Sequence, residues 1–252
     1  MIDALEWRGR FNPDSVVLKV PREQWRNYVA GMTAIFQLVF EQENPEVLIT
    51  PLRGAEPLRW ALEMMAERTG KVMPIVFSLP LGSAVDPDDI SSQRGLKGRE
   101  KVGVIDRYME ANFDWLKAVG WGDRVRTIMV LDEAQSGKTF TQAFRGLRGY
   151  LSKSGLDYIR LVGVVAKDDR PETRPVSRSL SALLREGRRD IHLISLAMPY
   201  IDRPHLLPMI LRQGEREGAP LLDVVANERG EMAVKQIVSE VLEGMNWPYD
   251  RV

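Results

Sequence analysis

The part of the chain that most constrains the fold is residues 127–139, which read TIMVLDEAQSGKT. An apolar run of strand length ends in two acids, Asp132 and Glu133, and the SGKT turn that follows opens a segment with helical spacing. A buried strand that leads through a glycine turn into a helix N-terminus presents backbone N–H groups that bind a phosphate. If a phosphate occupied the turn, the two acids would lie beside the hydroxyl groups of its sugar. The stretch therefore predicts a nucleotide or sugar-phosphate site.

Apolar segments of strand length alternate with amphipathic segments along the rest of the chain. This alternation is typical of a parallel sheet covered by helices on both faces, whose ligands bind at the carboxyl ends of the strands. We therefore expect an α/β fold in which the 252 residues form one domain, with a core at about 25–200 and a helical C-terminal extension at 201–252. Strands are expected at 46–50, 73–78, 126–131, 158–165 and 190–196, and helices at 22–40, 56–68, 108–119, 139–151, 177–186 and 231–245.

The SGKT turn raises the question of a Walker-type phosphate loop, which has the pattern Gly, four residues, Gly-Lys-Ser/Thr. Counting back from Gly137 and Lys138 places the first glycine of this pattern at position 132, which is Asp132. A carboxylate there would face the phosphate with like charge, and residues 125–136 contain no glycine. A divergent P-loop nucleotidase is therefore kept only as a second alternative.

The same stretch resembles the motif with which type I phosphoribosyltransferases bind 5-phosphoribosyl 1-pyrophosphate (PRPP). That motif consists of four apolar residues, two acids, two or three spacers and a Thr/Ser-Gly-x-Thr turn. Aligned without a gap, the resemblance places the 5-phosphate of PRPP on the turn and a ribose hydroxyl on Asp132, at the second acid position. The turn positions are taken by Ser136, Gly137, Lys138 and Thr139.

Two positions depart from this motif. Leu131 stands at the first acid position, and Gln135 stands where the purine enzymes of the family often have an aspartate that acts as a base. A shift of one residue restores the acid pair as Asp132 and Glu133 but shortens the loop. We expect Asp132 and Glu133 to be the catalytic contacts to ribose or magnesium. Gln135 is expected to bind substrate without accepting a proton, because an amide does not titrate in this range.

A second loop matches the same family in type, place and order. Residues 47–50 read as a short buried strand, and Arg53 and Gly54 follow it before an amphipathic helix. A backbone that approaches a pyrophosphate closely needs glycine, and a charge-assisted contact needs arginine. The resemblance implies that Arg53 and Gly54 hold the pyrophosphate of PRPP.

Residues 79–101 form the one long stretch without clear periodicity, and structureless stretches of this length are usually functional or disordered. The resemblance implies a flexible loop here that closes over PRPP, with Arg94 and Lys97 as candidate contacts to the pyrophosphate. It also implies that Lys167 reads an exocyclic oxygen of the base, and that a small hood from the terminal regions selects the base.

The activity that the resemblance implies is transfer of the phosphoribosyl group from PRPP to a nitrogenous base, with release of pyrophosphate. Mg²⁺ would be held mostly by oxygens of PRPP and partly by Asp132. Because Leu131 and Gln135 stand where the family has acids, an alternative stays open. In this alternative the protein binds PRPP or a nucleoside 5′-monophosphate without turnover and acts as a regulator.

Composition narrows the remaining classes of function. Lys and Arg together number 35, as do Asp and Glu, so no global field draws the chain to nucleic acid or to acidic membranes. The absence of cysteine excludes disulfides, and two histidines are too few for a zinc site built on imidazoles. The sequence shows neither a secretory signal nor an apolar run long enough to span a membrane. We therefore expect a cytoplasmic protein that binds a small molecule, with a homodimer through the terminal helix as a further expectation.

Overall fold

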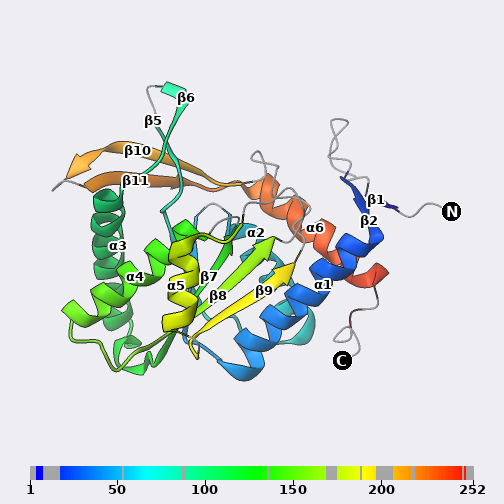
Figure 1. The fold of residues 1–252 in the computed structure, drawn as a ribbon, viewed down its shortest axis with the longest axis horizontal. Helices are drawn as coiled ribbons and strands as arrows, with labels where there is room; N and C mark the ends of the chain where they lie inside the picture. Colours follow the sequence, from blue (N-terminus) through cyan, green and yellow to red (C-terminus); the bar gives the residue numbers. More distant parts are fainter. Residues whose placement is uncertain are drawn as a thin grey trace.

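A five-stranded parallel sheet forms the centre of the molecule in the computed structural model (Figure 1). The structure describes residues 4–7, 18–52, 54–86, 89–134, 137–168, 175–187, 189–196, 207–216, 219–245 and 247. The strands are hydrogen-bonded in the order β4-β3-β7-β8-β9. Their bounds are β3 (Val47–Pro51), β4 (Ile75–Leu79), β7 (Thr127–Ala134), β8 (Arg160–Asp168) and β9 (Ile191–Leu196). The expected α/β fold with a parallel sheet is confirmed.

Helices cover both faces of this sheet. Three of them pack around one core and three around the other, and each core is made of apolar side chains from the strands and the helices together. The first face carries α1 (Arg22–Gln37), α2 (Glu56–Thr69) and α6 (Glu228–Gly244). The second face carries α3 (Gly98–Ala118), α4 (Lys138–Lys153) and α5 (Arg178–Glu186).

The strand order places a topological switch point between β3 and β7. From β3 the chain crosses to β4 on one side, and it later reaches β7, β8 and β9 on the other side. The helix after β3 is α2, on the first face, whereas the helix after β7 is α4, on the second face. In open α/β sheets a crevice forms at such a point, outside the carboxyl ends of the two strands, and ligands bind there.

Side chains along β7 alternate between the two cores. Leu131 belongs to the core beneath α1, α2 and α6, whereas Val130 and Ala134 belong to the core beneath α3, α4 and α5. Because successive side chains of a strand point to opposite faces, Asp132 lies on the α3–α4 face and Glu133 lies on the α2 face. The two acids therefore leave the same strand end in opposite directions.

A smaller mixed sheet lies at the side of the molecule towards which β8 and β9 point (Figure 1). It joins two parts of the chain that are far apart in sequence, and its strand order is β11-β10-β5-β6. Arg212 on β10 pairs with Glu100 of α3 at 3.1 Å, which fastens this sheet to the second helical layer. The strands are β5 (Ala84–Asp86), β6 (Asp89–Arg94), β10 (Met209–Arg216) and β11 (Ala219–Val225).

Three stretches differ from the sequence-based expectation. Residues 79–101 are not one structureless loop, since they contain β5, β6 and the beginning of α3. Residues 201–252 contain the β10–β11 hairpin before their helix, so this part of the chain is not helical throughout. β7 extends through Ala134 because residues 131–134 continue the parallel pairing with β8. Short strands that pair across a long sequence separation leave little local periodicity, which explains the first two differences.

The C-terminal segment docks onto α1. Trp247 is buried, its indole Nε1 donates a hydrogen bond to the hydroxyl of Thr33 at 3.0 Å, and its ring meets Phe36 edge-on. Near the other end of the chain, β1 (Ala4–Trp7) and β2 (Leu18–Pro21) form an antiparallel pair. None of the helices that the structure describes combines the length and the apolar character that crossing a bilayer would require.

Candidate functional site

The two loops that the sequence singled out meet at the switch point. Gly54 follows β3, and a Cβ atom at Gly54 would lie 2.5 Å from the carboxylate oxygen Oε2 of Glu133. Ile49 and Val130 are register partners in β3 and β7, which brings the carboxyl ends of the two strands to the same edge. A side chain at position 54 would therefore displace the end of the Glu133 side chain. Arg53 lies outside the described residues.

Asp132 is a buried carboxylic acid at this edge. Its exposed fraction is 3%, and its Oδ2 atom accepts no hydrogen bond from the part of the chain that the structure describes. Burial, and secondarily the charge of Glu133, raise the pKa of Asp132 well above its usual value. A hydrogen bond from the backbone of Glu133 and the charge of Lys101 offset only part of this effect. A buried carboxyl with a strongly shifted pKa at the ligand-binding edge of a sheet is a candidate functional group.

Lys101 on α3 supplies the nearby positive charge. Its ammonium group donates a hydrogen bond to the side-chain oxygen of Gln142 on α4 at 2.7 Å. Burial lowers the pKa of Lys101, and the charge of Asp132 acts in the opposite direction. The hydrogen bond to Gln142 thus fixes the ammonium group of Lys101 against α4, and its positive charge interacts with the carboxylate of Asp132.

The described part of the turn after β7 consists of Gly137, directly before the N-terminus of α4. Gly137 has a φ of 73°, in the left-handed region that favours glycine, and α4 begins at the next residue, Lys138. The hydroxyl of Thr141 donates a hydrogen bond to the carbonyl oxygen of Gly137 at 2.8 Å, which fixes the first turn of the helix. Thr139 lies in the same first turn, whereas Gln135 and Ser136 lie outside the described residues.

The length of this turn argues against a Walker-type loop. A Walker pattern ending at Gly137 and Lys138 would begin at Asp132, so Asp132, Glu133 and Ala134 would belong to the loop. In the structure these three residues belong to β7 and pair in register with β8. Only residues 135–137 remain between the strand and α4, and they are too few to wrap around a phosphate as that loop does.

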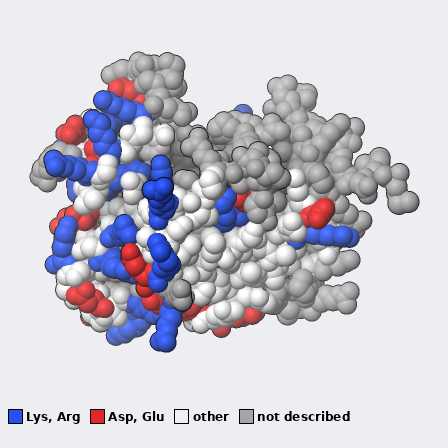
Figure 2. Space-filling model, in the orientation of Figure 1, with Lys and Arg blue, Asp and Glu red and all other residues white. Residues whose placement is uncertain are grey.

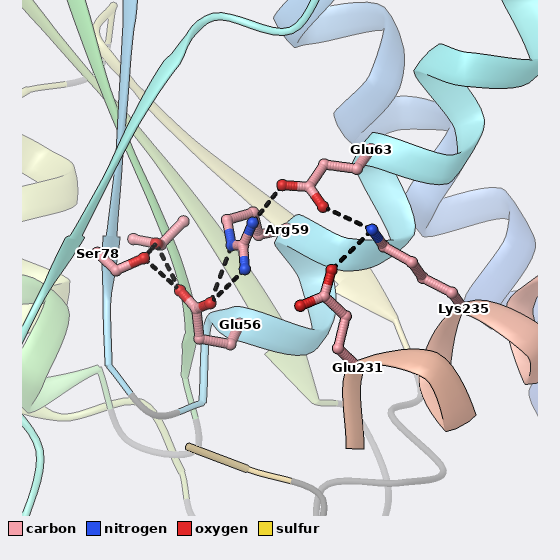
Figure 3. Close-up of polar contacts among 7 residues, drawn as sticks. Glu56, Arg59, Glu63, Ser78, Glu231 and Lys235 are labelled. Atoms are coloured by element: carbon pink, nitrogen blue, oxygen red, sulfur yellow. Dashed lines mark hydrogen bonds and ion pairs between the residues drawn. The ribbon is translucent and has the colours of Figure 1, made fainter. Parts of the chain in front are cut away.

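A second buried carboxylate, Glu56, lies at the same edge of the sheet, at the beginning of α2 (Figure 3). Its Oε1 atom accepts hydrogen bonds from the hydroxyls of Thr50 and Ser78, both at 2.9 Å. Its Oε2 atom accepts a hydrogen bond from Nε of Arg59 at 2.9 Å and forms an ion pair with Nη2 of the same guanidinium at 2.8 Å. Because Thr50 and Ser78 are register partners in β3 and β4, Glu56 links the ends of both strands to α2.

The network around Glu56 continues outward to α6 (Figure 3). Arg59 also pairs with Glu63 one turn along α2. Lys235 on α6 bridges Glu63 at 3.0 Å and Glu231 at 2.7 Å. A chain of alternating charges therefore connects the terminal helix to the segment that carries Gly54.

The three other cations that were expected to contact the ligand, Arg94, Lys97 and Lys167, lie on different elements. Arg94 ends β6 and is exposed, and the exposed Lys97 is the N-cap of α3, where its backbone N–H donates to the Glu100 carboxylate at 2.6 Å. Lys167 lies on β8 beside Ala134, and its ammonium group donates to the backbone carbonyl of the next residue. Lys167 therefore lies next to the end of β7, whereas Arg94 and Lys97 lie on the segment that leads into α3.

Reasoning from the sequence missed the Glu56 network and the role of Lys101. Glu56 and Arg59 at helical spacing were visible in the sequence, but nothing there shows that the hydroxyls of Thr50 and Ser78 converge on Glu56. Lys101 was expected in a loop, whereas it is helical and faces α4. The only available signal was the position of Thr50 and Ser78 near the ends of two predicted strands.

Comparison with models of known protein families, with curated protein sequences and with solved structures finds no match to this chain. Within the described residues, no group of three or more His, Asp or Glu side chains gathers as a metal site.

Proposed function

We propose that this protein is a phosphoribosyltransferase of the type I kind, which binds PRPP at the switch point and transfers its phosphoribosyl group to a nitrogenous base. The observation that carries the proposal is the meeting of Gly54 with the acid-bearing end of β7, directly before the turn that opens α4. A pyrophosphate loop, a sugar contact and a phosphate turn would then lie side by side at one edge of the sheet.

The ligand is oriented by the chemistry of the three segments. The 5-phosphate would accept hydrogen bonds from the N–H groups of residues 136–139, where the dipole of α4 favours a negative charge. The ribose hydroxyls would donate to the carboxylate of Glu133 on the face of Gly54, and Asp132 would contact the ligand from the α3–α4 face of β7. The pyrophosphate would lie on Arg53 and Gly54, where the missing side chain lets the backbone approach.

Glu133 offers a replacement for the acid that the motif lacks at Leu131. Leu131 is fully buried in the core beneath α2, so no carboxylate occupies the first acid position. Glu133 lies on the same face of β7, one pleat nearer to the end of the strand, and it reaches the backbone of Gly54. We infer that Glu133 takes over the ribose contact from a position shifted along the strand.

The transfer requires breaking the bond between the anomeric carbon and the pyrophosphate oxygen, whose electron pair leaves with pyrophosphate. The lone pair of a base nitrogen forms the new bond to carbon, and the proton of that nitrogen passes to solvent, since Gln135 cannot accept it. Positioning and fixed charges would supply most of the rate. Lys167, beside the end of β7, is the candidate to contact an oxygen of the base.

Magnesium fits the donor set at this site. Mg²⁺ prefers oxygen ligands and usually combines one or two carboxylates with phosphate oxygens of the substrate. Asp132, with a buried carboxylate oxygen that accepts no hydrogen bond from the described residues, would hold the ion together with PRPP. When bound, the ion would stabilise the charge that develops on the departing pyrophosphate.

The small mixed sheet is the candidate for the hood and the closing segment. β5 and β6 lie in the stretch expected to cover PRPP, and β10 and β11 come from the C-terminal region. Arg94 ends β6 and Lys97 caps α3, so both cations could approach the pyrophosphate if this sheet moved towards the switch point.

A protein that binds PRPP or a nucleoside 5′-monophosphate without turnover is the second candidate. Two observations favour it: Leu131 is buried where the family has an acid, and burial favours the neutral form of Asp132. Both weaken the grip on a cation-like ribose more than the grip on a phosphate, which depends on the turn before α4.

The test combines binding with turnover. Thermal unfolding is followed with magnesium-PRPP, with a nucleoside 5′-monophosphate and with magnesium-ATP, for the wild type, Asp132→Asn and the surface control Asp114→Asn. A ligand at about 100 times its dissociation constant should stabilise the fold by about 2.7 kcal/mol. We expect PRPP to stabilise the wild type and Asp114→Asn but not Asp132→Asn.

Pyrophosphate release is then measured with PRPP and a panel of purine and pyrimidine bases. Release that depends on a base and on Asp132 supports the transferase. PRPP binding without release identifies the regulatory binder, and no response to PRPP or to a monophosphate overturns both.

A further inference from the structure

A groove runs between the exposed sides of α3 and α4, from Lys101 and Lys138 near the switch point to Lys153 at the far end of α4. Its volume is about 510 Å³, and Gly98, Lys101 and Val102 of α3 line one wall while Lys138 and Arg145 of α4 line the other. None of the acids at the end of β7, nor Gly54, lines it. The groove has the size of a small-molecule site, for which about 300–1,000 Å³ is typical.

Positive charge is concentrated on the α4 side of this groove. α4 carries four cations and no acid, although Lys and Arg balance Asp and Glu over the whole chain. Figure 2 shows Lys and Arg side chains gathered over α3, α4 and α5. Three of the four cations line the groove, namely Lys138, Arg145 and Lys153. A local cluster of this kind on a neutral protein attracts a compact polyanion rather than any acidic surface.

The cations of the groove are available to a ligand at little cost. Arg145 pairs with Glu186 at 3.6 Å, and both partners are about half exposed. Lys153, which is 66% exposed, pairs at 3.2 Å with Asp106, which is 37% exposed and also lines the groove. Exposed ion pairs contribute only about 0–1 kcal/mol, so a phosphate can replace the carboxylate. Lys138 has no ion pair or side-chain hydrogen bond with the residues that the structure describes.

Small and apolar residues of both helices line the floor of the groove. At Gly146 the two helices touch, since a Cβ there would lie 2.4 Å from Cδ1 of Ile105. At Gly149, which also lines the groove, a Cβ would meet no atom within 4 Å. Neither packing nor a positive φ requires glycine at 149, and glycine inside a helix costs roughly 0.5–1 kcal/mol relative to alanine. Its effect is to leave the floor open at this turn of α4. Val102, another apolar residue of the lining, is 45% exposed.

We propose that the groove between α3 and α4 binds a nucleoside polyphosphate, with the phosphates on the cations and the planar base on the glycine floor. Residues 138–153 span about 22 Å along the helix, which accommodates a base, a ribose and two or three phosphates in line. The described lining contains no aromatic side chain, so the groove lacks the stacking platforms that single-stranded nucleic acid uses. This proposal goes beyond the PRPP site and does not depend on it.

Isothermal titration with ATP and GTP, without magnesium and at about 0.1 M salt, tests the proposal, with adenosine and tripolyphosphate as comparators. Two variants change the groove without touching the switch point: Arg145→Glu removes a rim cation, and Gly149→Leu fills the floor with a good helix former. Arg148→Glu is the matched control, because Arg148 lies on the same helix outside the groove and changes the charge equally.

We expect at least one of the two nucleotides to bind, and both groove variants to weaken it tenfold or more while Arg148→Glu changes it less than threefold. Gly149→Leu should still be stabilised by PRPP, and this result would separate the groove from the site at the switch point. An unchanged midpoint of urea unfolding would show that Gly149→Leu folds. Three results overturn the proposal. The first is that neither nucleotide binds. The second is that tripolyphosphate binds as tightly as ATP and that Gly149→Leu leaves ATP affinity unchanged. The third is that Arg148→Glu weakens nucleotide binding as much as Arg145→Glu does.

Discussion

Glu56 and Asp132 are two buried carboxylates at the same edge of the central sheet, and their surroundings are opposite. Both oxygens of Glu56 are occupied, one by two hydroxyls and the other by a guanidinium. Asp132 has an oxygen that accepts no hydrogen bond from any described residue, and burial raises the pKa of its carboxyl group. Glu56 fastens α2 to the ends of β3 and β4, whereas the Oδ2 atom of Asp132 forms no hydrogen bond that would link β7 to another described element.

This difference separates a structural acid from one reserved for a ligand. A buried carboxylate with all its partners is strongly destabilising to remove, because its partners lose their acceptor. A buried carboxylate without a full set of partners already costs stability, and such a cost persists at sites where a ligand supplies the missing donors. The following predictions test whether the two acids behave in these two ways.

The largest effect is expected for Glu56→Ala. This change leaves the guanidinium of Arg59 and the hydroxyls of Thr50 and Ser78 without their acceptor, so we expect a loss of about 3–5 kcal/mol in the free energy of unfolding. Urea unfolding measures it. Glu67→Ala, an exposed position on the same helix, is the control and should change stability by less than about 0.5 kcal/mol. Equal effects of the two variants would contradict a structural role of Glu56.

The next largest effect has the opposite sign. Asp132→Asn removes a desolvated carboxylate, so at pH 7 we expect the variant to be more stable than the wild type by roughly 1–3 kcal/mol. The same variant should lose its stabilisation by PRPP. Urea unfolding with and without PRPP measures both changes. A destabilised variant would mean that Asp132 is held by interactions as Glu56 is, and the contrast between the two acids would fail.

The pH dependence of stability follows from the raised pKa of Asp132. Because the pKa of Asp132 is raised in the folded state, the folded protein binds its proton more tightly than the unfolded chain, whose pKa is about 3.9. The contribution of Asp132 to stability is therefore most favourable below the unfolded pKa and falls as the pH rises through the folded pKa. The excess stability of Asp132→Asn should accordingly grow from about pH 4 upward. Urea unfolding from pH 4 to 9 measures it, and a constant difference would contradict the shift.

The sequence predicted the central sheet and the turn before α4 because their signals are local. Residues 128–131 and 161–166 are continuous apolar runs, as expected for strands buried on both faces. The glycine at 137 marked the turn, and Gly54 marked a close approach that the structure explains by Glu133.

The small mixed sheet and the Glu56 network could not be predicted in the same way. Residues 84–94 pair with a hairpin at 209–225, and such pairing depends on partners that are distant in sequence. The hydroxyls of Thr50 and Ser78 become partners of Glu56 only when β3 and β4 lie in register. The high pKa of Asp132 depends on how deeply the layer of α3 and α4 buries it, which no sequence window contains.

A smaller effect is expected at the outer end of the Glu56 network. Lys235 is partly exposed, and Glu63 keeps Arg59 as a partner when Lys235 is replaced. Lys235→Met should therefore lower the free energy of unfolding by only about 0.5–1 kcal/mol, and the loss should shrink at high salt. Urea unfolding at low and high ionic strength measures it. A loss as large as that of Glu56→Ala would show that the network acts as one unit from α2 to α6.

The smallest change in stability is expected for Gly54→Ala, where the effect on binding should be large. The added Cβ would meet the end of the Glu133 side chain, which can rotate away, so urea unfolding should show a change of less than about 0.5 kcal/mol. The rotation displaces the carboxylate assigned to the ribose, and the methyl group keeps the backbone away from the pyrophosphate. PRPP affinity measured by titration should therefore fall tenfold or more. Gly244→Ala, where a Cβ meets nothing, is the control. If Gly54→Ala binds PRPP as the wild type does, the approach of Gly54 to Glu133 is only a packing contact, and the site must be sought elsewhere along this edge.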